Sequence, residues 1–546
     1  MSLGGARVDV PAGAVQVVAR TGPVNFLAGS LVDISSGSGT AGAGGLSILA
    51  GGTAALAGGL VGTGPSATRS GSFSLTAGAL TDFSGLNQQL NAGGLSRGRS
   101  IETLSGDLVL VAGETIQAEE VTLAASGGRL IVSGLIDAQG PDGGRVLLAA
   151  RDDLTVTTGA EIDARPTAAS DRASRVTLSS ENGDVSLETG SRVRLDGFGG
   201  DTGGELLVRA RATTDDIRVA SLGGAIEGAL RTILEPVLHA DPIEVLDAFV
   251  TDSLRSLLDN FMAAAPATIR SRLGARADVL VRPGLEVVAD NDLVVTDPWD
   301  LADWRWDDQP GYLTLRAPGN LSVQGNLSDG FRKNGTVLGQ LSGDSWSFDL
   351  VAGADPGSVL SAGVRGRLLD APGTGSLDVG DSLLVRTGTG DIRLVAANDL
   401  ILGGSTTAIY TAGVAARQAI NIGTVRANWS RDGGDISLAA GRDISATLPS
   451  QVMSGWNVRN LGSGGRAQWA TDYGRFNQGV AALAGGTVDV AAGRDILNLS
   501  ATVATTSGDV PTVPGTFDIW GGGSLGVAAG RDLLGGTYSI WQGNGS

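Results

Sequence analysis

The chain has 546 residues, 86 of them Gly, and its 39 basic and 57 acidic residues leave a formal net charge of −18. The Gly content is about twice the ~7% of average proteins, but it lacks the every-third-residue spacing of collagen, and 42% hydrophobic residues are too many for a disordered chain. The negative charge argues against nucleic acid and anionic membranes as partners, and we expect no membrane insertion. Cys is absent and His239 is the single His, so we expect no metal and no cofactor.

The first part of the chain carries no targeting or membrane-spanning signal. Residues 1–6 lack a basic region followed by an apolar run, so we expect any signal peptide of the native protein to lie outside this chain. Residues 34–68 are uncharged, but eight Gly among the 22 residues 41–62 disfavour a spanning helix. The composition predicts a Gly/Ala-rich solenoid face or loop there.

Two short signatures recur along the chain. An Ala-Ala-Gly-Arg-Asp-Ile/Leu signature occurs three times, with looser copies elsewhere: Ala439–Ile444, Ala491–Ile496, Ala528–Leu533, and then Ala149–Leu154, Ala289–Leu293 and Ala396–Leu400. A Gly-Asp pair precedes an alternating segment at five positions: Gly106, Gly183, Gly390, Gly434 and Gly508. The pairs Asp391/Asp399 and Asp435/Asp443 are both eight residues apart and are offset by 44, which fits two coils of about 22 residues.

Between these turns the residues alternate between apolar and polar, as in Arg175–Ser180, which is the pattern of a half-buried strand. Gly permits positive φ at a corner, and Asp or Asn binds the backbone nearby. One coil cannot bury its own apolar face, so coils stack. The sequence therefore predicts an all-β fold, a right-handed parallel β-helix (β-solenoid), over residues 1–221 and 277–546.

Residues 222–276 break the repeat and predict a small α-helical insertion. Apolar residues from Leu246 to Phe261 follow helical spacing, with Asp241 as the expected N-cap and Pro266 as the expected end of the helix. The three expected helices cover residues 225–234, 241–265 and 267–273. We interpret the insertion as a helical hairpin docked on the β-helix, or as a partner-binding module.

All nine Trp lie at or beyond position 299, and three of them fall in the segment Asp297–Asp308, where carboxylates alternate with indoles. Trp and Asp together are a common arrangement for holding sugars, because an indole stacks on the sugar ring and a carboxylate accepts from hydroxyls. The alternative is that these indoles cover an exposed stretch of core. The candidate ligand-binding residues are Trp299, Trp304, Trp306, Asp300 and Asp303. A second aromatic stretch, Trp456–Phe476, is expected to form a long loop lying on the coils.

Polysaccharide-cleaving β-helix enzymes are an alternative class, but their active sites need clustered carboxylates or bases on neighbouring coils. The repeated acids of this chain occupy turn positions that already explain them: Asp107, Asp184, Asp391, Asp435, Asp443, Asp495 and Asp532. We therefore identify no catalytic residue and expect no enzyme activity.

Several phrases of the second half resemble the filamentous haemagglutinin-like exoproteins of two-partner secretion. They are Pro310–Ala317, Leu327–Phe331 and Tyr473–Val480, continuing to Ala491–Ile496. The first half resembles this family only through generic coils. The family's N-terminal secretion domain, with Asn-Pro-Asn-type motifs, is missing, so the resemblance is to an interior or C-terminal stalk region.

The resemblance implies a long β-helical stalk exported through a dedicated outer-membrane β-barrel transporter, surface display or release, adhesion, and in some members delivery of a C-terminal toxin. We therefore hypothesise a non-enzymatic stalk segment of a large secreted or cell-surface bacterial adhesin, acting in attachment or as a spacer. Its expected partners are the transporter and host or neighbouring-cell surfaces, including glycans. The alternative is a polysaccharide-binding or polysaccharide-cleaving β-helix protein.

Overall fold

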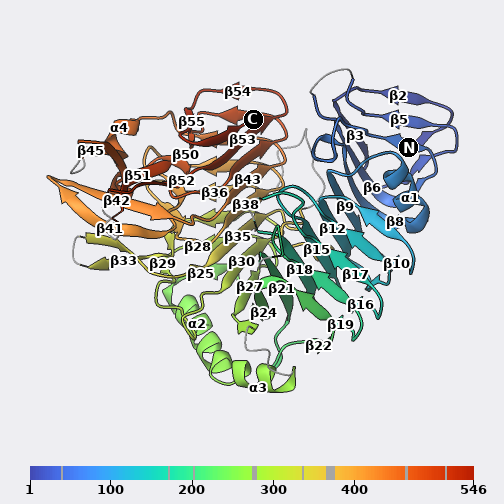
Figure 1. Cartoon of the computed structure of the whole chain (residues 1–546), viewed down its shortest axis with the longest axis horizontal. Coiled ribbons are helices and arrows are strands. Elements are labelled where there is room, and N and C mark those ends of the chain that lie inside the picture. Colours follow the sequence, from blue (N-terminus) through green and yellow to red (C-terminus); the bar gives the residue numbers. More distant parts are fainter. Residues whose placement is uncertain are drawn as a thin grey trace. The chain divides into compact units, whose positions relative to one another are not determined.

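The computed structural model describes residues 1–37, 41–169, 173–200, 203–240, 242–273, 279–334, 337–364, 375–461, 465–510, 513 and 515–546. Its fold is an all-β parallel β-helix with a small helical part, as the sequence predicts (Figure 1). The chain forms two compact units. The first comprises Met1–Val237, Ala263–Val281 and Gly357–Leu360, and the second comprises Leu238–Met262, Arg282–Pro356 and Ser361–Ser546.

The first unit is built from coils whose strands stack in three faces (Figure 1). Its first face pairs, in parallel and in this order, β3 (Ala14–Ala19), β6 (Gly45–Leu56), β8 (Ser72–Leu80), β9 (Gly98–Thr103), β12 (Glu120–Ala125), β15 (Arg145–Ala150), β18 (Arg175–Ser180), β21 (Gly204–Arg211), β24 (Ala229–Ala240) and β26 (Val279–Val281). The second face holds β10 (Leu108–Leu110), β13 (Leu130–Val132), β16 (Leu154–Val156), β19 (Val185–Leu187) and β22 (Val219–Leu222). The third holds β11 (Thr115–Gln117), β14 (Leu135–Asp137), β17 (Glu161–Asp163), β20 (Arg192–Arg194) and β23 (Ala225–Glu227).

The N-terminal coils of this unit add shorter elements. They are β1 (Ser2–Leu3), β2 (Arg7–Asp9), β4 (Val24–Phe26), β5 (Leu31–Asp33), β7 (Gly59–Val61) and a 3₁₀ turn at Ala67–Arg69. The uncharged segment 34–68 thus contains strands, as predicted, within the residues described. A helix that the sequence analysis missed, α1 (Phe83–Ala92), contacts β7, β10 and β11. The Asp82 side chain caps it by accepting from the Gly85 N–H at 2.8 Å.

The core of the first unit is made of aliphatic ladders. Leu123, Leu148, Leu178 and Val208 occupy equivalent positions on four successive strands, and each is at most 1% exposed. Alternate residues of a strand point to opposite sides, so the apolar half of each strand lines the interior. Small aliphatic residues fill this narrow interior, which accounts for the low aromatic content of the first half.

The second unit repeats the three-face arrangement. Its first face holds β27 (Gly284–Val288), β30 (Tyr312–Ala317), β35 (Ser347–Ala352), β38 (Ile392–Ala396), β43 (Ile436–Ala440), β48 (Val488–Ala492), β53 (Gly523–Ala529) and β56 (Gly543–Gly545). The second holds β25 (Val245–Leu246), β28 (Leu293–Val295), β31 (Leu321–Val323), β36 (Leu377–Val379), β39 (Leu400–Leu402), β44 (Ile444–Ala446), β49 (Ile496–Leu497) and β54 (Leu533–Leu534). The third holds β29 (Trp299–Asp300), β32 (Leu327–Ser328), β37 (Leu384–Thr387), β40 (Ala408–Thr411), β47 (Gly479–Ala482), β50 (Ala501–Val503) and β55 (Tyr538–Ile540).

Antiparallel hairpins project from the coils of the second unit. One pairs β33 (Phe331–Asn334) with β34 (Val337–Gln340). A larger sheet, the hairpin sheet, combines β41 (Val414–Ile422), β42 (Val425–Arg431), β45 (Asn457–Leu461), β46 (Ala467–Thr471), β51 (Thr505–Asp509) and β52 (Phe517–Gly521) (Figure 1). Two short elements, α4 (Met453–Trp456) and a 3₁₀ turn at Tyr473–Arg475, flank β45 and β46.

The hairpins explain why the predicted coil length is wrong. Ile392 of β38 pairs directly with Ile436 of β43, so the 44-residue offset is one coil containing the hairpin β41–β42, not two coils of 22. The Ala-Ala-Gly-Arg-Asp signature does mark a corner, because Ala440 ends β43 and Ile444 begins β44. Gly508, by contrast, lies inside β51 and not at a coil turn.

The helical region is shorter than predicted. Residues 225–234 belong to β23 and β24, so the helix expected there is wrong. Two helices remain, α2 (Ala248–Met262) in the second unit and α3 (Ala265–Arg272) in the first, and the described part of the chain has no helix long and apolar enough to cross a membrane. The expected N-cap Asp241 lies outside the described residues; the Asp247 side chain instead accepts from the N–H of Val250 at 2.9 Å. Pro266 begins α3.

The Gly of the Gly-Asp turns is required for a different reason than predicted. A Cβ on Gly434 would lie 2.2 Å from the carbonyl oxygen of Gly390, and a Cβ on Gly390 would lie 1.9 Å from that of Trp346. Successive coils therefore approach too closely for a side chain. Gly106 is the case in which positive φ decides, at +84° with open space around it.

Candidate functional site

The acidic Trp segment, residues Asp297–Asp308, forms a corner of the second unit. Trp299 lies on β29, and its side chain and that of Trp304 are buried, at 3% and 4% exposure. Trp304 packs edge-on against Trp299 and against Trp346, a residue that the sequence analysis did not single out. Burial leaves neither Trp299 nor Trp304 an exposed face on which a sugar could stack, so the stacking interpretation is corrected for these two residues.

The two candidate acids of this segment have structural contacts. Asp300 accepts from the N–H of Ala302 at 3.0 Å, and Asp303 forms an exposed ion pair with Arg332. Trp306 is the one candidate indole that stays partly exposed, and its Nε1 donates to Asp259 at 3.0 Å. Both acids are exposed, and ligand binding by Asp300, Asp303 and Trp306 stays a prediction.

The acidic Trp segment also anchors α2. Asp297 accepts from the N–H of Ala248 at the start of the helix at 2.9 Å, Trp306 donates to Asp259 in its last turn, and Arg255 donates to the carbonyl of Asp303 at 3.3 Å. Leu254, Leu258 and Phe261 of the helix are buried. The helix α2 and the acidic Trp segment thus form one packed structure within the second unit.

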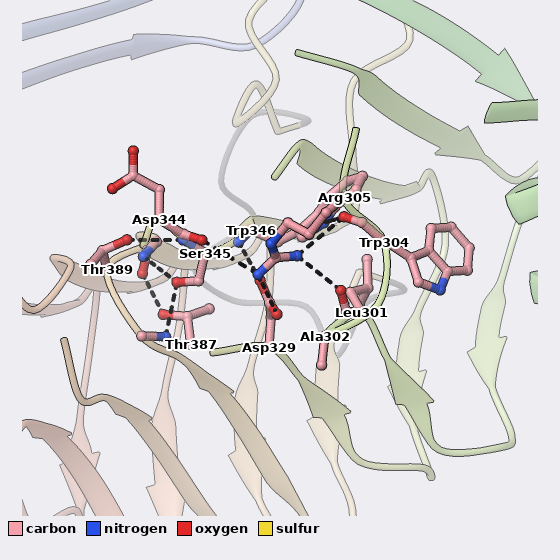
Figure 2. Close-up of polar contacts among 12 residues, drawn as sticks. Leu301, Ala302, Trp304, Arg305, Asp329, Asp344, Ser345, Trp346, Thr387 and Thr389 are labelled. Carbon is pink, nitrogen blue, oxygen red and sulfur yellow. Dashed lines mark hydrogen bonds and ion pairs between the residues drawn. The ribbon is translucent and has the colours of Figure 1, made fainter. Parts of the chain in front are cut away.

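A buried ion pair holds this corner together (Figure 2). The Arg305 Nη2 donates to both oxygens of Asp329 at 2.8 and 2.7 Å, and the Trp346 N–H donates to Asp329 at 2.6 Å. Arg305 Nη1 also donates to the carbonyls of Leu301 and Trp304 at 3.0 and 3.1 Å. The Asp329 side chain is fully buried, and this burial raises its pKa although Arg305 and the backbone donors act in the opposite direction.

Next to this pair, Ser345 links neighbouring coils (Figure 2). Its Oγ accepts from the N–H groups of Gly388 and Gly390 at 2.9 and 2.8 Å, and its own N–H donates to Thr389 Oγ1 at 2.9 Å. The Ser345 hydroxyl is thus committed to backbone donors. These three hydrogen bonds explain Ser345 as a structural group.

The acids at the turns form ladders between coils. Asp399 accepts from the N–H of Asp443 at 3.1 Å and from Arg442 Nε and Nη2 at 2.8 and 2.7 Å. Asp443 repeats this one coil further with Asp495 and Arg494, and the hydrogen bond from Arg494 lowers the pKa of Asp443. Asp391 likewise accepts from the N–H of Asp435 at 2.9 Å. These carboxylates are therefore engaged in hydrogen bonds and ion pairs between coils, so their turn positions explain them structurally, as the sequence analysis expected.

A second aromatic cluster lies where the hairpin sheet meets the coils of the second unit. Phe331, Tyr410, Trp456, Tyr473 and Phe476 are all buried and pack edge-on in a chain of ring contacts. The stretch Trp456–Phe476, expected as a long loop, contains β45, β46 and a 3₁₀ turn, so that expectation is wrong. Strand pairing across the hairpin satisfies the backbone that a loop would leave to solvent.

At the edge of this cluster is a cavity of about 450 Å³, here called the indole cavity. Its described lining comes from four strands of the hairpin sheet, β45, β46, β51 and β52, and from the segment after β55: Asn457, Trp469, Thr505, Ser507, Ile519, Trp541 and Gln542. Trp469 is 39% exposed, and Trp541 is partly exposed and stacks on the buried Trp456, with ring centroids 5.6 Å apart. The cavity thus has two accessible indoles.

Two polar atoms at the indole cavity have no hydrogen-bond partner: Asn457 Oδ1 and Thr505 Oγ1. Both atoms are buried, and Thr505 as a residue is 8% exposed. None of the lining residues that the structure describes is charged. The sequence analysis missed this site because its residues come from five segments between Asn457 and Gln542. The composition indicated only the aromatic stretch Trp456–Phe476.

A second cavity, of about 380 Å³, is more polar and is lined by residues of β41 and β42 and by the Asp472–Arg475 turn. Asp472 accepts there from the N–H of Arg426 at 3.0 Å and pairs with Arg475 at 3.4 Å. In the described residues no group of three or more His, Asp or Glu side chains is placed to hold a metal ion. Comparison with protein families, with curated proteins and with solved structures found no match.

Proposed function

We propose that this chain is a non-enzymatic stalk segment of a large secreted or cell-surface bacterial exoprotein, acting in attachment or as a spacer. The observation that carries the proposal is the ladder of turn acids. Asp399 and Asp443 each use their carboxylate to bind both the backbone and the Arg of the following coil. The repeated acids therefore connect each coil to the next, and a stalk that spaces or attaches other domains requires such connections between its coils.

The way in which insertions are tolerated supports the same role. The strand register of the first face passes unshifted from β38 through β43 and β48 to β53, although a hairpin leaves the coil between β38 and β43. Hairpins on a regular scaffold can present binding surfaces without disturbing the rod. The expected partners are an outer-membrane β-barrel transporter and a cell surface, including its glycans.

Export through a two-partner transporter tests the proposal. The chain is fused behind the secretion domain of a filamentous haemagglutinin-like exoprotein and expressed with the matching transporter in a Gram-negative host. We expect the fusion in the medium or at the cell surface, where added protease degrades it. The secretion domain alone is the positive control. A fusion retained inside the cell while the control is exported would contradict the proposal.

Attachment and catalysis are tested separately on the purified chain. Beads coated with the chain should attach to cells if this segment is adhesive, and beads coated with the heat-unfolded chain are the control. Equal attachment of both kinds of bead would indicate a spacer. Incubation with pectin and alginate, with and without calcium, should yield no new reducing or unsaturated ends, and reproducible cleavage would favour the enzyme alternative.

A further inference from the structure

The indole cavity has the composition of a site for a neutral, hydroxyl-bearing ligand. Trp469 pairs across the hairpin sheet with Ser507, and Ser507 pairs with Ile519, so these three side chains lie in one row on neighbouring strands. Trp541 closes the cavity from the coil side, with its ring centroid 6.3 Å from that of Trp469 and an interplanar angle of 69°. The two indole rings therefore line the cavity from two directions.

The polar side chains of the lining narrow the class of ligand. Asn457, Ser507 and Gln542 place amide and hydroxyl groups beside the two indoles. A purely apolar ligand would cover these groups and leave them without hydrogen-bond partners, which is costly. A ligand with hydroxyl groups next to an apolar ring face satisfies both the indoles and these polar side chains.

The absence of charged groups among the described lining residues narrows the class of ligand further. The described lining residues include no Arg, Lys, Asp or Glu, and the guanidinium carbon of Arg459 lies 6.0 Å from the Trp469 ring centroid. A carboxylate or ammonium group would have no counter-ion among these described residues, and the chain's net charge of −18 repels anionic ligands at long range. The volume of about 450 Å³ lies within the usual range for small-molecule sites.

We infer that the indole cavity binds a neutral saccharide, with the sugar ring against Trp469 and Trp541 and its hydroxyls on the polar side chains of Asn457 and Ser507. This places saccharide binding away from the acidic Trp segment, where two of the three indoles are buried. As an attachment site the cavity rests on the proposed function, but binding itself is measured on the isolated chain, so a failure of export and a failure of binding are distinguishable.

Isothermal titration calorimetry with the full chain tests the inference. The probes are cellobiose, lactose, maltose and N,N′-diacetylchitobiose, with digalacturonic acid as the acidic comparator. We expect at least one neutral disaccharide to bind with a Kd near the millimolar range and the acidic comparator not to bind. Trp469→Ala should weaken binding about tenfold or more, because stacking and burial on the ring are both lost. Asn457→Ala should weaken it about fivefold, since one hydrogen bond is lost.

Trp520→Ala is the matched control, because Trp520 is a partly exposed indole on β52 of the same sheet that is not among the described lining residues of the cavity. It should leave the Kd unchanged. No binding by any neutral disaccharide, binding unchanged by Trp469→Ala, loss of binding in Trp520→Ala alone, or binding of the acidic comparator alone would each overturn the inference. Near-ultraviolet circular dichroism checks the fold of each variant. If Trp469→Ala unfolds the hairpin sheet, Trp469→Phe and Asn457→Ala decide the question by the same criteria.

Discussion

Removal of the Asp443 carboxylate tests whether the turn acids stabilise the β-helix. Asp443 is 14% exposed and accepts from the N–H of Asp495 at 3.1 Å, from Arg494 Nε at 2.8 Å and from Arg494 Nη2. Hydrogen bonds to charged groups contribute about 1.5–3 kcal/mol each, and the 34% exposure of Arg494 reduces its share by solvent screening. We expect Asp443→Ala to lower the free energy of unfolding by about 2–3 kcal/mol. Asp443→Asn should lower it by about 1 kcal/mol, because the amide oxygen still accepts from the backbone.

The assay is urea denaturation followed by Trp fluorescence. All nine Trp belong to the second unit, so the signal reports on the unit that contains Asp443. Asp532→Ala is the matched control, since Asp532 holds the same position in the signature but is 54% exposed, with a 3.5 Å ion pair to its neighbour Arg531. It should change the free energy by less than about 0.5 kcal/mol. Equal effects of Asp443→Ala and Asp532→Ala would refute the reasoning.

The stabilisation by Asp443 also depends on pH with a defined sign. The pKa of Asp443 is lowered in the folded chain by Arg494, so its contribution is fully present above the unfolded pKa of about 3.9 and is lost as the pH falls through the folded-state pKa. Between pH 5 and pH 2 the unmodified chain should therefore lose more stability than Asp443→Asn. Parallel losses in the two proteins would contradict this assignment.

Three further substitutions probe other features of the second unit. Gly434→Ala should cost about 1–3 kcal/mol, because its Cβ would lie 2.2 Å from a backbone oxygen, whereas Gly339→Ala, whose nearest contact is 3.7 Å, should be near neutral in the same denaturation assay. Trp304→Ala should cost about 3–5 kcal/mol and alter the near-ultraviolet circular dichroism, as expected for a buried indole; a near-neutral result would restore the stacking interpretation. Asp329→Asn should cost about 3–5 kcal/mol because it leaves the Arg305 guanidinium, 17% exposed, without its counter-ion, and a stabilising effect would show that burial of the ion pair is the larger cost.

The strands were predictable from the sequence because their period is local. In Arg175–Ser180 the apolar residues Val176 and Leu178 alternate with polar ones, and a strand is the backbone that places them on one side. The Ala-Ala-Gly-Arg-Asp signature could also be assigned to a corner, since its Gly and Asp are turn residues. Stacking then follows, because no single coil buries its own ladder.

The coil length was not predictable, because insertions between strands leave the local pattern intact. The 44 residues from Ile392 to Ile436 contain one hairpin, and only the pairing of those two residues distinguishes one long coil from two short ones. The segment 225–234 was also not predictable from local sequence. It was expected to be a helix, yet parallel pairing of β23 with β20 and of β24 with β21 makes it strand.

The sequence by itself therefore determined the β-helical class, the corners and the structural use of the turn acids, since each depends on residues close together in the chain. Only the tertiary structure decided which indoles are accessible. Trp304 is buried by Trp346 and Trp299. Trp469 belongs to the hairpin sheet, and the packing of the strands between Asn457 and Gly521 leaves its side chain exposed. Exposure depends on neighbours that are distant in sequence, so composition identified the Trp-rich segment, and packing placed the candidate site elsewhere.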